Sequence, residues 1–475
     1  MSPGQPACFE TVGDLAIVLH THMPYVEGFD TWPFGEEWLF DAVARSHLPV
    51  LKAATKVTMS VTPVLADQLE AGGVAERMEA FLDLRRVDAH EREAAEVDGP
   101  LRVAAEAEAQ RYRASRADLR GLDGNVLSAF ADAQREGRVA LMSSAASHAV
   151  LPMLATRAGA RLQIDAGLRS HERRFGASGG FWLPECAYRP GLDAALAERD
   201  IRWTCLDQSA SESELDALAP LRLPSGLVGF AIDWPTVELV WSTGGYPADP
   251  AYLDSHRRSA RGTRLWRVDG EPYDPEAAAD RAAEHADDFL TAVRSRLDEF
   301  SAERDSRGLC VFAIDTELLG EGWGEGPTWL AEVSARARSN AVELVTLPEA
   351  MERHEPERRD ALESSWGEGK DFTTWDAPEV ADMAWTARQL ELRLVRAAAE
   401  GVGGRGYERA LRELLALQSS DWAFMVSRSR ASEYGERRAA GHAEALRSAL
   451  AGGGNTDPSL RNLAPDLDPR SFLTP

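Results

Sequence analysis

Cysteine, long apolar runs and positive charge are all scarce in this sequence of 475 residues. The four cysteines (Cys8, Cys186, Cys205 and Cys310) are scattered without a CxxC pair, which predicts reduced thiols in a cytoplasmic protein. No run of 18 apolar residues occurs, so we expect no membrane-spanning helix. The first residues lack a basic segment followed by an apolar one, so no signal peptide is expected.

The charge balance restricts the partners. Lysine and arginine number 52 against 77 aspartate and glutamate residues, which gives a formal net charge of −25. Such an acidic chain is a poor partner for nucleic acid or an anionic membrane. It is compatible with a neutral substrate such as a glucan.

The length exceeds what one compact core usually holds, so we expect one large domain with an appendage. Short apolar runs alternate with helical segments, a pattern typical of a parallel α/β sheet or barrel. We expect strands at 14–19, 57–61, 139–142, 181–184, 201–206, 227–233, 309–314 and 343–346, and helices at 161–174, 190–199, 275–304 and 327–339. Residues 66–138 read as a helical insertion, residues 375–452 as further helices, and the tail beyond as a surface loop.

The segment FWLPECAY is the most informative in the chain. It places Glu185 beside the aromatic residues Phe181, Trp182 and Tyr188. Aromatic rings can stack on the apolar faces of a pyranose while the acid acts at the anomeric carbon. A buried core strand ending in a satisfied glutamate is the alternative, but apolar strands seldom end in a lone carboxylate without a function.

A second acid follows another apolar run. The segment VFAID ends in Asp315, where barrel enzymes place catalytic groups. Two carboxyl groups at strand ends, each near tryptophan, suggest a pair that processes glycosides. A separation of roughly 5–5.5 Å would favour a retaining reaction through a covalent glycosyl-enzyme. Glu317 and Asp207 are competing acids on physical grounds.

His20 and His22 follow the first expected strand, and strand alternation places both on one face. They could hold zinc, hydrogen-bond sugar hydroxyls, or form a satisfied core pair. The sugar-binding interpretation is favoured, because no third ligand is indicated by spacing. His148, after another strand, has the same alternatives.

Several loops also carry aromatic residues. Tyr246 tips the segment STGGYP, and Trp366 and Trp375 lie in or near SSWGEG. Tryptophan in a glycine-rich loop is better placed for stacking than for core packing. QSSDW, with Asp421 and Trp422, reads as a helix-packing feature with a polar contact.

Together the segments HTHMPY, SSAASHAVLP, WLPECAY, FAIDTELLGEGW, SSWGEGKDFTTW and QSSDW resemble glycoside hydrolase family 57, and within it the 1,4-α-glucan branching enzymes. The resemblance implies an incomplete (β/α)7 barrel with an inserted helical region and a C-terminal helical domain. It implies a catalytic barrel over residues 10–350, with the insertion at about 66–138, and a helical domain over 351–475 that contributes to the substrate groove.

The resemblance also implies roles for individual residues. Glu185 would be the nucleophile and Asp315 the general acid/base, with no metal and no cofactor. The implied substrate-binding residues are His20, His22, His148, Trp182, Tyr246, Trp323, Trp366, Trp375, Asp421 and Trp422. Tyr246 resembles the loop tyrosine that covers the family's active site. The expected substrate is an α-glucan, in glycogen biosynthesis, handled by a monomer or a small homo-oligomer.

One segment departs from the family's pattern. After the acid/base, branching enzymes of the family show a His-Trp-Trp stretch, whereas this chain has Glu321-Gly322-Trp323. The change bears on substrate affinity and on the ratio of transfer to hydrolysis.

Other functions remain open on the sequence. An α-amylase or a 4-α-glucanotransferase could use the same two acids. A deacetylase or mannosidase-like enzyme would use the histidines to bind zinc, and a glucan-binding protein would have no catalytic activity.

Overall fold

The computed structural model describes residues 11–26, 35–452 and 462–473. Cys8 and residues 453–461 of the predicted tail loop therefore lie outside the described residues. The described part of that tail, 462–473, is not wholly a surface loop, because it contains a short helix at Arg470–Leu473 and buries Leu463 and Phe472. Within the described residues the strands are β1 (Gly13–Thr21), β2 (Val57–Val61), β3 (Val139–Ser144), β4 (Gly180–Trp182), β5 (Trp203–Leu206), β6 (Leu221–Arg222), β7 (Val228–Ala231), β8 (Gly308–Asp315), β9 (Val342–Leu344) and β10 (Glu357–Arg358).

These strands form one curled sheet in the order β10-β6-β7-β5-β4-β3-β2-β1-β8, with β9 also paired to β1. Every pairing is parallel except that of β6 with β7. The sheet curls far enough for the Asp233 amide, just beyond β7, to donate to the Val311 carbonyl of β8 over 2.8 Å. Because the strands are parallel, their carboxyl ends meet at one edge.

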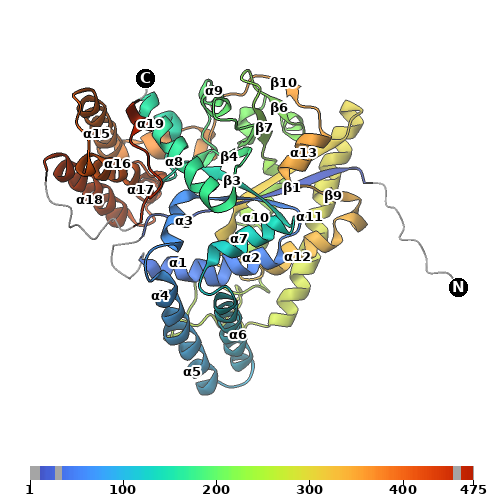
Figure 1. Ribbon diagram of the computed structural model, residues 1–475. Helices are drawn as coiled ribbons and strands as arrows, with labels where there is room; N and C mark the ends of the chain where they lie inside the picture. Colours follow the sequence, from blue (N-terminus) through green and yellow to red (C-terminus); the bar gives the residue numbers. More distant parts are fainter. Residues whose placement is uncertain (1–10, 27–34, 453–461, 474–475) are drawn as a thin grey trace.

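Helices cover the outside of the sheet (Figure 1). Their bounds are α1 (Glu36–Ala42), α2 (Leu48–Ala53), α3 (Pro63–Leu69), α4 (Val74–Phe81), α5 (Asp88–Glu96), α6 (Pro100–Gly121), α7 (Val126–Arg135), α8 (Arg157–Phe175), α9 (Leu192–Ala197), α10 (Trp234–Trp241), α11 (Pro275–Arg304), α12 (Gly326–Arg336), α13 (Leu347–Arg353), α14 (Thr373–Asp376), α15 (Ala381–Ala399), α16 (Arg405–Leu417), α17 (Ser420–Ser427), α18 (Ser432–Leu450) and α19 (Arg470–Leu473).

The predicted helical segments form two separate groups. Helices α4, α5 and α6 project as an arm from the sheet, and α15 to α18 form a cluster at its side (Figure 1). The cluster has its own apolar core, which includes Leu414, Trp422 and Leu446. Tyr25 and Leu162 of the sheet region join this core, so the cluster is packed firmly against the carboxyl edge of the strands.

Local chemistry explains the most regular predicted helix. Asp274 precedes α11, and its side chain accepts hydrogen bonds from the amides of Glu276 and Ala277, while Pro275 occupies the first helical position. Buried residues recur along the helix, among them Phe289, Val293 and Leu297. They pack in the same core as the apolar side chains of β1 and β8, so α11 anchors the strand that ends in Asp315.

Candidate active site

Glu185 lies in a strained turn directly after β4. Its φ is +61° and that of Cys186 is +48°, in the left-handed region that non-glycine residues seldom adopt. Each such residue costs about 1–3 kcal/mol and persists only where the surroundings fix it. The Trp366 amide fixes this turn by donating to the Glu185 carbonyl over 2.9 Å.

Two donors hold the Glu185 carboxylate. The Ser420 hydroxyl donates to Oε1 over 2.7 Å, and the Trp366 indole N–H donates to Oε2 over 2.9 Å. Burial raises the pKa of Glu185 above its usual value, and these two hydrogen bonds oppose the rise. The carboxylate is therefore fixed in direction, as a nucleophile must be.

Asp315 ends β8, opposite His20 of β1 in the strand register. Burial raises its pKa to about 8, and the negative charges of Glu317 and Glu185 add to the rise. Among the described residues, no hydrogen bond reaches its carboxyl group. Asp315 is therefore protonated at neutral pH, which suits a general acid.

Glu317, a competing acid on the sequence, is the third carboxyl group at this edge. Its Oε1 accepts from the His22 amide over 3.2 Å and pairs with His47 Nε2 over 2.6 Å. His47 lies in a buried π-helical turn, Val43–His47, between α1 and α2. No sequence motif had pointed to this histidine. Glu317 is thus anchored beside Asp315 rather than free to replace it.

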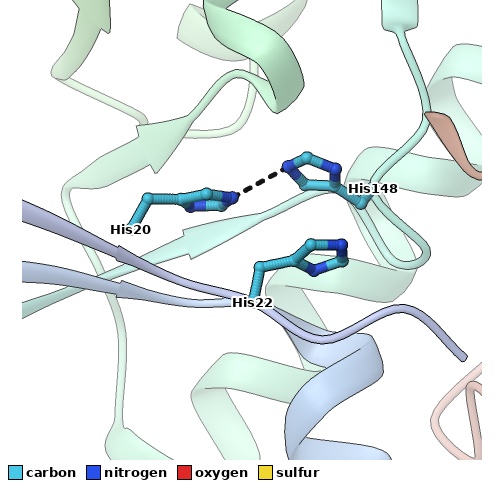
Figure 2. Close-up of side chains that lie close together, drawn as sticks. All are labelled: His20, His22 and His148. Carbon is cyan, nitrogen blue, oxygen red and sulfur yellow. Dashed lines mark hydrogen bonds between the residues drawn. The ribbon is translucent and has the colours of Figure 1, made fainter. Parts of the chain in front are cut away.

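The three predicted histidines come together at the ends of β1 and β3 (Figure 2). His20 Nε2 and His148 Nε2 are 2.9 Å apart, and the rings of His22 and His148 stack with centroids 4.0 Å apart. Trp182 also stacks on His20, with ring centroids 4.6 Å apart. The prediction that His20 and His22 share a face is confirmed.

Donor counting gives the hydrogen bonds of this cluster a direction. Ser420 donates to Glu185, so its oxygen accepts from His148 Nδ1–H over 2.9 Å. His148 Nε2 must then accept from His20 Nε2–H, and His20 Nδ1 accepts from the Ser60 hydroxyl over 2.6 Å. The pKa of both histidines is lowered, first by burial, which agrees with two neutral rings.

His22 is the member of the cluster whose pKa is raised. Burial lowers its pKa, but the Asp421 carboxylate, 3.0 Å from Nε2, outweighs burial and makes the net shift upward. Its Nδ1 bonds Thr62 over 3.0 Å. The ligand nitrogens of the three histidines lie within 4.8 Å of one another, close enough for a metal ion. Since every ring nitrogen already has a protein partner, the donor set fits a hydrogen-bond network better than a cation.

The helical cluster completes the site through the start of α17. Ser420 bonds both Glu185 and His148, and its amide donates to the His148 carbonyl over 3.0 Å. Asp421 pairs with His22. The sequence motif QSSDW had pointed to Asp421 and Trp422, but not to Ser420, which contacts Glu185 directly.

The tryptophans divide into two groups. Trp366 is half-buried, donates to Glu185 and meets Trp182 edge to face at 5.0 Å. The others predicted to bind substrate are buried: Trp182 is 0%, Trp323 1%, Trp375 3% and Trp422 0% exposed. Burial leaves these four rings little surface for direct stacking on a sugar, and their place in the substrate site stays a prediction.

The buried tryptophans have packing roles instead. Trp323 lies among Trp329 and Tyr252, and the Trp422 indole donates to the Ala416 carbonyl within the helical cluster. Trp375 packs beside Val150 and Phe372. The ring of Trp182 stacks on that of His20. The glycine-rich sequence around the loop tryptophans predicts rings that are exposed for stacking. The loops instead fold inward and bury the indole rings.

Two further predicted residues point away from the carboxyl pair. The Tyr246 hydroxyl donates to Asp288 of α11 over 2.6 Å, and its ring stacks on His285 at 4.3 Å. The described structure therefore does not bring the Tyr246 hydroxyl to the carboxyl pair. Asp207 accepts from Lys370, from the Trp234 indole and from the Ser209 amide. Its full set of donors fits a structural role better than acid catalysis.

The residues that depart from the family's pattern, Glu321-Gly322-Trp323, lie next to Glu317. Burial raises the pKa of Glu321 to about 7, helped by Asp41 and Glu317 and opposed by Arg264. The Glu321 carbonyl accepts from Arg264 over 2.9 Å. Gly320 before it has φ +107°, and a Cβ there would lie 1.9 Å from the Arg45 carbonyl oxygen, so only glycine fits.

Comparisons with known proteins agree with this geometry. The model of glycosyl hydrolase family 57 matches residues 16–363, and that of the 1,4-alpha-glucan branching enzyme C-terminal region matches residues 384–463. A 1,4-alpha-glucan branching enzyme of Thermococcus kodakarensis is 31% identical over 90% of this chain and 71% of its own length. A probable 1,4-alpha-glucan branching enzyme of Mycobacterium tuberculosis is 31% identical over 93% of both chains.

Solved structures give the same picture. A family 57 branching enzyme from Pyrococcus horikoshii has a TM-score of 0.91 at 31% identity, covering 98% of this chain and 97% of its own. An α-amylase from Thermotoga maritima has a TM-score of 0.85 at 25% identity, covering 98% and 99%. These likenesses confirm the predicted incomplete (β/α)7 barrel with a C-terminal helical region.

Among helices of the described residues, none has the length and apolar character to cross a membrane.

Proposed function

Because the chain belongs to glycosyl hydrolase family 57, we propose that it is a retaining 1,4-α-glucan branching enzyme. The observation that carries the proposal is the contrast between its two carboxyl groups. Glu185 is held by two donors, and Asp315 is kept protonated by burial and by neighbouring negative charge. Two carboxyl groups whose surroundings differ in this way have distinct acid and nucleophile roles.

The first half-reaction cleaves an α-1,4 bond. Asp315 gives its proton to the glycosidic oxygen of the leaving chain while Glu185 forms a bond to the anomeric carbon. The leaving chain departs with a new hydroxyl group. Glu185 is then covalently bound to the donor sugar, and the negative charge has moved to Asp315.

The second half-reaction makes the branch. Asp315 takes the proton from the 6-hydroxyl of an acceptor glucan, whose oxygen attacks the anomeric carbon and releases Glu185. Both steps invert the configuration, so the α-anomer is retained. Water competes with the acceptor in this step, and transfer dominates only where the site excludes water and positions the acceptor.

The remaining predicted residues have supporting roles in this proposal. His20, His22 and His148 border the donor sugar, and a sugar hydroxyl that bonds one of these rings replaces its present protein partner. Trp366 orients Glu185. Residues 10–350 supply both carboxyl groups, and residues 351–475 complete the site with Ser420 and Asp421. The three described cysteines are free and buried, which supports the cytoplasm as the location. The proposed substrate is a glycogen-like glucan.

Proton NMR of amylose incubated with the protein tests the proposal. The anomeric signals of α-1,4 and α-1,6 linkages are followed together with released reducing ends. We expect the α-1,6 signal to grow without a matching number of reducing ends. Reducing ends without new α-1,6 signal would make the protein an α-amylase, and new α-1,4 chain lengths alone would make it a 4-α-glucanotransferase.

A further inference from the structure

A polar groove of about 540 Å³ lies at the carboxyl edge of β5 and β7. Its volume is within the range of binding sites for small molecules. Asp207 and Gln208 follow β5, and Trp234 begins α10 just after β7. The groove therefore opens at the edge that also carries Glu185 and Asp315.

One loop joins the groove to the nucleophile. Trp366 of this loop donates to Glu185 through its indole and its amide. Four residues later, Lys370 enters the groove and donates to Asp207 over 3.0 Å. The same segment thus lines the groove and fixes the catalytic turn.

The wall of the groove is rigid. The Trp234 indole donates to Asp207 over 2.6 Å, and the Lys370 ammonium lies 3.2 Å from the centre of the indole ring. An aromatic ring held by a hydrogen bond and a cation–π contact needs no ordering when a ligand binds.

The remaining lining fits a neutral polyhydroxylated ligand. Glu212 and Glu238 add negative charge, which disfavours phosphorylated or other anionic ligands. The Gln208 amide, the Asp207 carboxylate and the Trp234 ring also line the groove. Carboxylate, amide and indole groups are side chains that bind sugars.

The groove and the histidine cluster occupy opposite arcs of the curled sheet. Between β4 and β8, the strands β3, β2 and β1 carry the histidines and their partners on one side. On the other side β5 and β7 carry the groove, and the Asp233–Val311 hydrogen bond brings β7 to β8. Each half of the sheet therefore runs from β4, next to Glu185, to β8, which ends in Asp315.

We propose that this groove binds the acceptor glucan chain, while the histidine arc holds the donor sugar. The inference rests on the proposed function, because only a transfer reaction needs a second chain. Oriented by Trp234 and the polar side chains that line the groove, the acceptor presents its 6-hydroxyl to the glycosyl-enzyme. The chain that binds there also displaces water from the second half-reaction.

Filling the groove tests this assignment. Ser211→Tyr places a ring in the groove and removes no hydrogen bond of the wild-type side chain. The donor is an α-maltosyl fluoride, whose fluoride leaving group does not occupy the groove, and maltohexaose is the acceptor. We expect Ser211→Tyr to raise the maltohexaose concentration for half-maximal transfer about tenfold or more, and to leave fluoride release without acceptor within about twofold.

A matched control is Ser306→Tyr, in an exposed turn before β8 at the opposite edge of the sheet, which should behave as wild type. Thermal unfolding checks that each variant folds, and Glu212→Trp fills the outer groove if Ser211→Tyr does not. An unchanged acceptor dependence in a folded, groove-filled variant would overturn the proposal.

Failure of the proposed function has a different signature. A wild-type enzyme that releases fluoride but forms no α-1,6 bond, or releases none, would contradict branching itself. The groove is then judged by NMR titration of maltohexaose into wild type and the filled variant. Equal binding by both, or no binding by wild type, would overturn the groove as a glucan site.

Discussion

Glu185 and Asp315 lie at the same edge of one sheet, but their surroundings are opposite in kind. Glu185 lies in a strained turn, and Ser420 of α17 and Trp366 of a separate loop supply two hydrogen-bond donors to its carboxylate. The end of β8 surrounds Asp315 with negative groups, of which Glu317 has the largest effect on its pKa. Donors fix and stabilise a carboxylate, whereas buried negative neighbours keep a carboxyl group protonated. The difference between the two carboxyl groups therefore comes from the residues around them rather than from the residue type.

Replacing Glu185 by glutamine should have the largest effect. The amide keeps the size of the side chain but cannot form the glycosyl-enzyme, so turnover of amylose should fall by at least about 10⁴-fold. Maltohexaose binding, followed by NMR titration, should be retained. With Glu185→Ala and added azide, a β-glycosyl azide should form, because azide attacks from the side of the missing carboxylate. Near wild-type turnover would refute the assignment.

Asp315→Asn should reduce turnover of amylose by about 10²–10⁴-fold, since the proton donor is lost. The loss should be much smaller for an α-maltosyl fluoride in the first half-reaction, because fluoride needs little proton assistance. Azide added to Asp315→Ala should give an α-glycosyl azide. The opposite azide stereochemistry in the two series is the sharpest test of the comparison, and the same anomer from both would contradict it.

Ser420→Ala removes one of the two donors that distinguish Glu185 from Asp315. A hydrogen bond to a charged group contributes about 1.5–3 kcal/mol, so kcat should fall by roughly 10- to 100-fold. The protein should still fold, with a lower midpoint of thermal unfolding, because the buried His148 Nδ1–H loses its acceptor at a cost of about 1–3 kcal/mol. Ser427→Ala at the other end of α17 is the matched control and should keep its activity. Equal kcat for the two variants would argue against a role of Ser420 at the nucleophile.

Glu317→Gln should have the smallest effect, and it should appear in the pH profile. The acid form of Asp315 is lost as the pH rises through its pKa of about 8. Removing the Glu317 charge stabilises the Asp315 carboxylate, so the alkaline limb of kcat should move to lower pH by about one unit. The groups left facing Asp315 are Glu185, His22 and Asp421. An unmoved limb would mean that the charge of Glu317 does not raise the pKa of Asp315.

Much of the fold could be predicted from the sequence. The apolar runs at 57–61 and 309–314 became β2 and β8 within two residues at either end, because parallel strands covered on both faces need continuous apolar stretches. The two-residue strands β6 and β10 have no such signal and depend on their neighbours. Helix α10 was not predicted, since its short apolar segment has no clear helical period.

The site was predictable only where its chemistry follows local pattern. Glu185 and Asp315 end apolar runs, and the alternation of His20 and His22 is a property of one strand. Ser420 contacts Glu185 across 235 positions of sequence, and no local pattern encodes such a contact. Burial of Trp323 and Trp422 likewise depends on packing partners from other elements.

The contact between Ser420 and Glu185 also bears on how the protein is made. Synthesis proceeds from the N-terminus, and domains fold as they emerge. Both carboxyl groups leave the ribosome well before Ser420, so the nascent barrel contains its acids while the serine that orients the nucleophile is still missing. We therefore expect the site to be completed only near the end of translation, when Ser420 reaches Glu185.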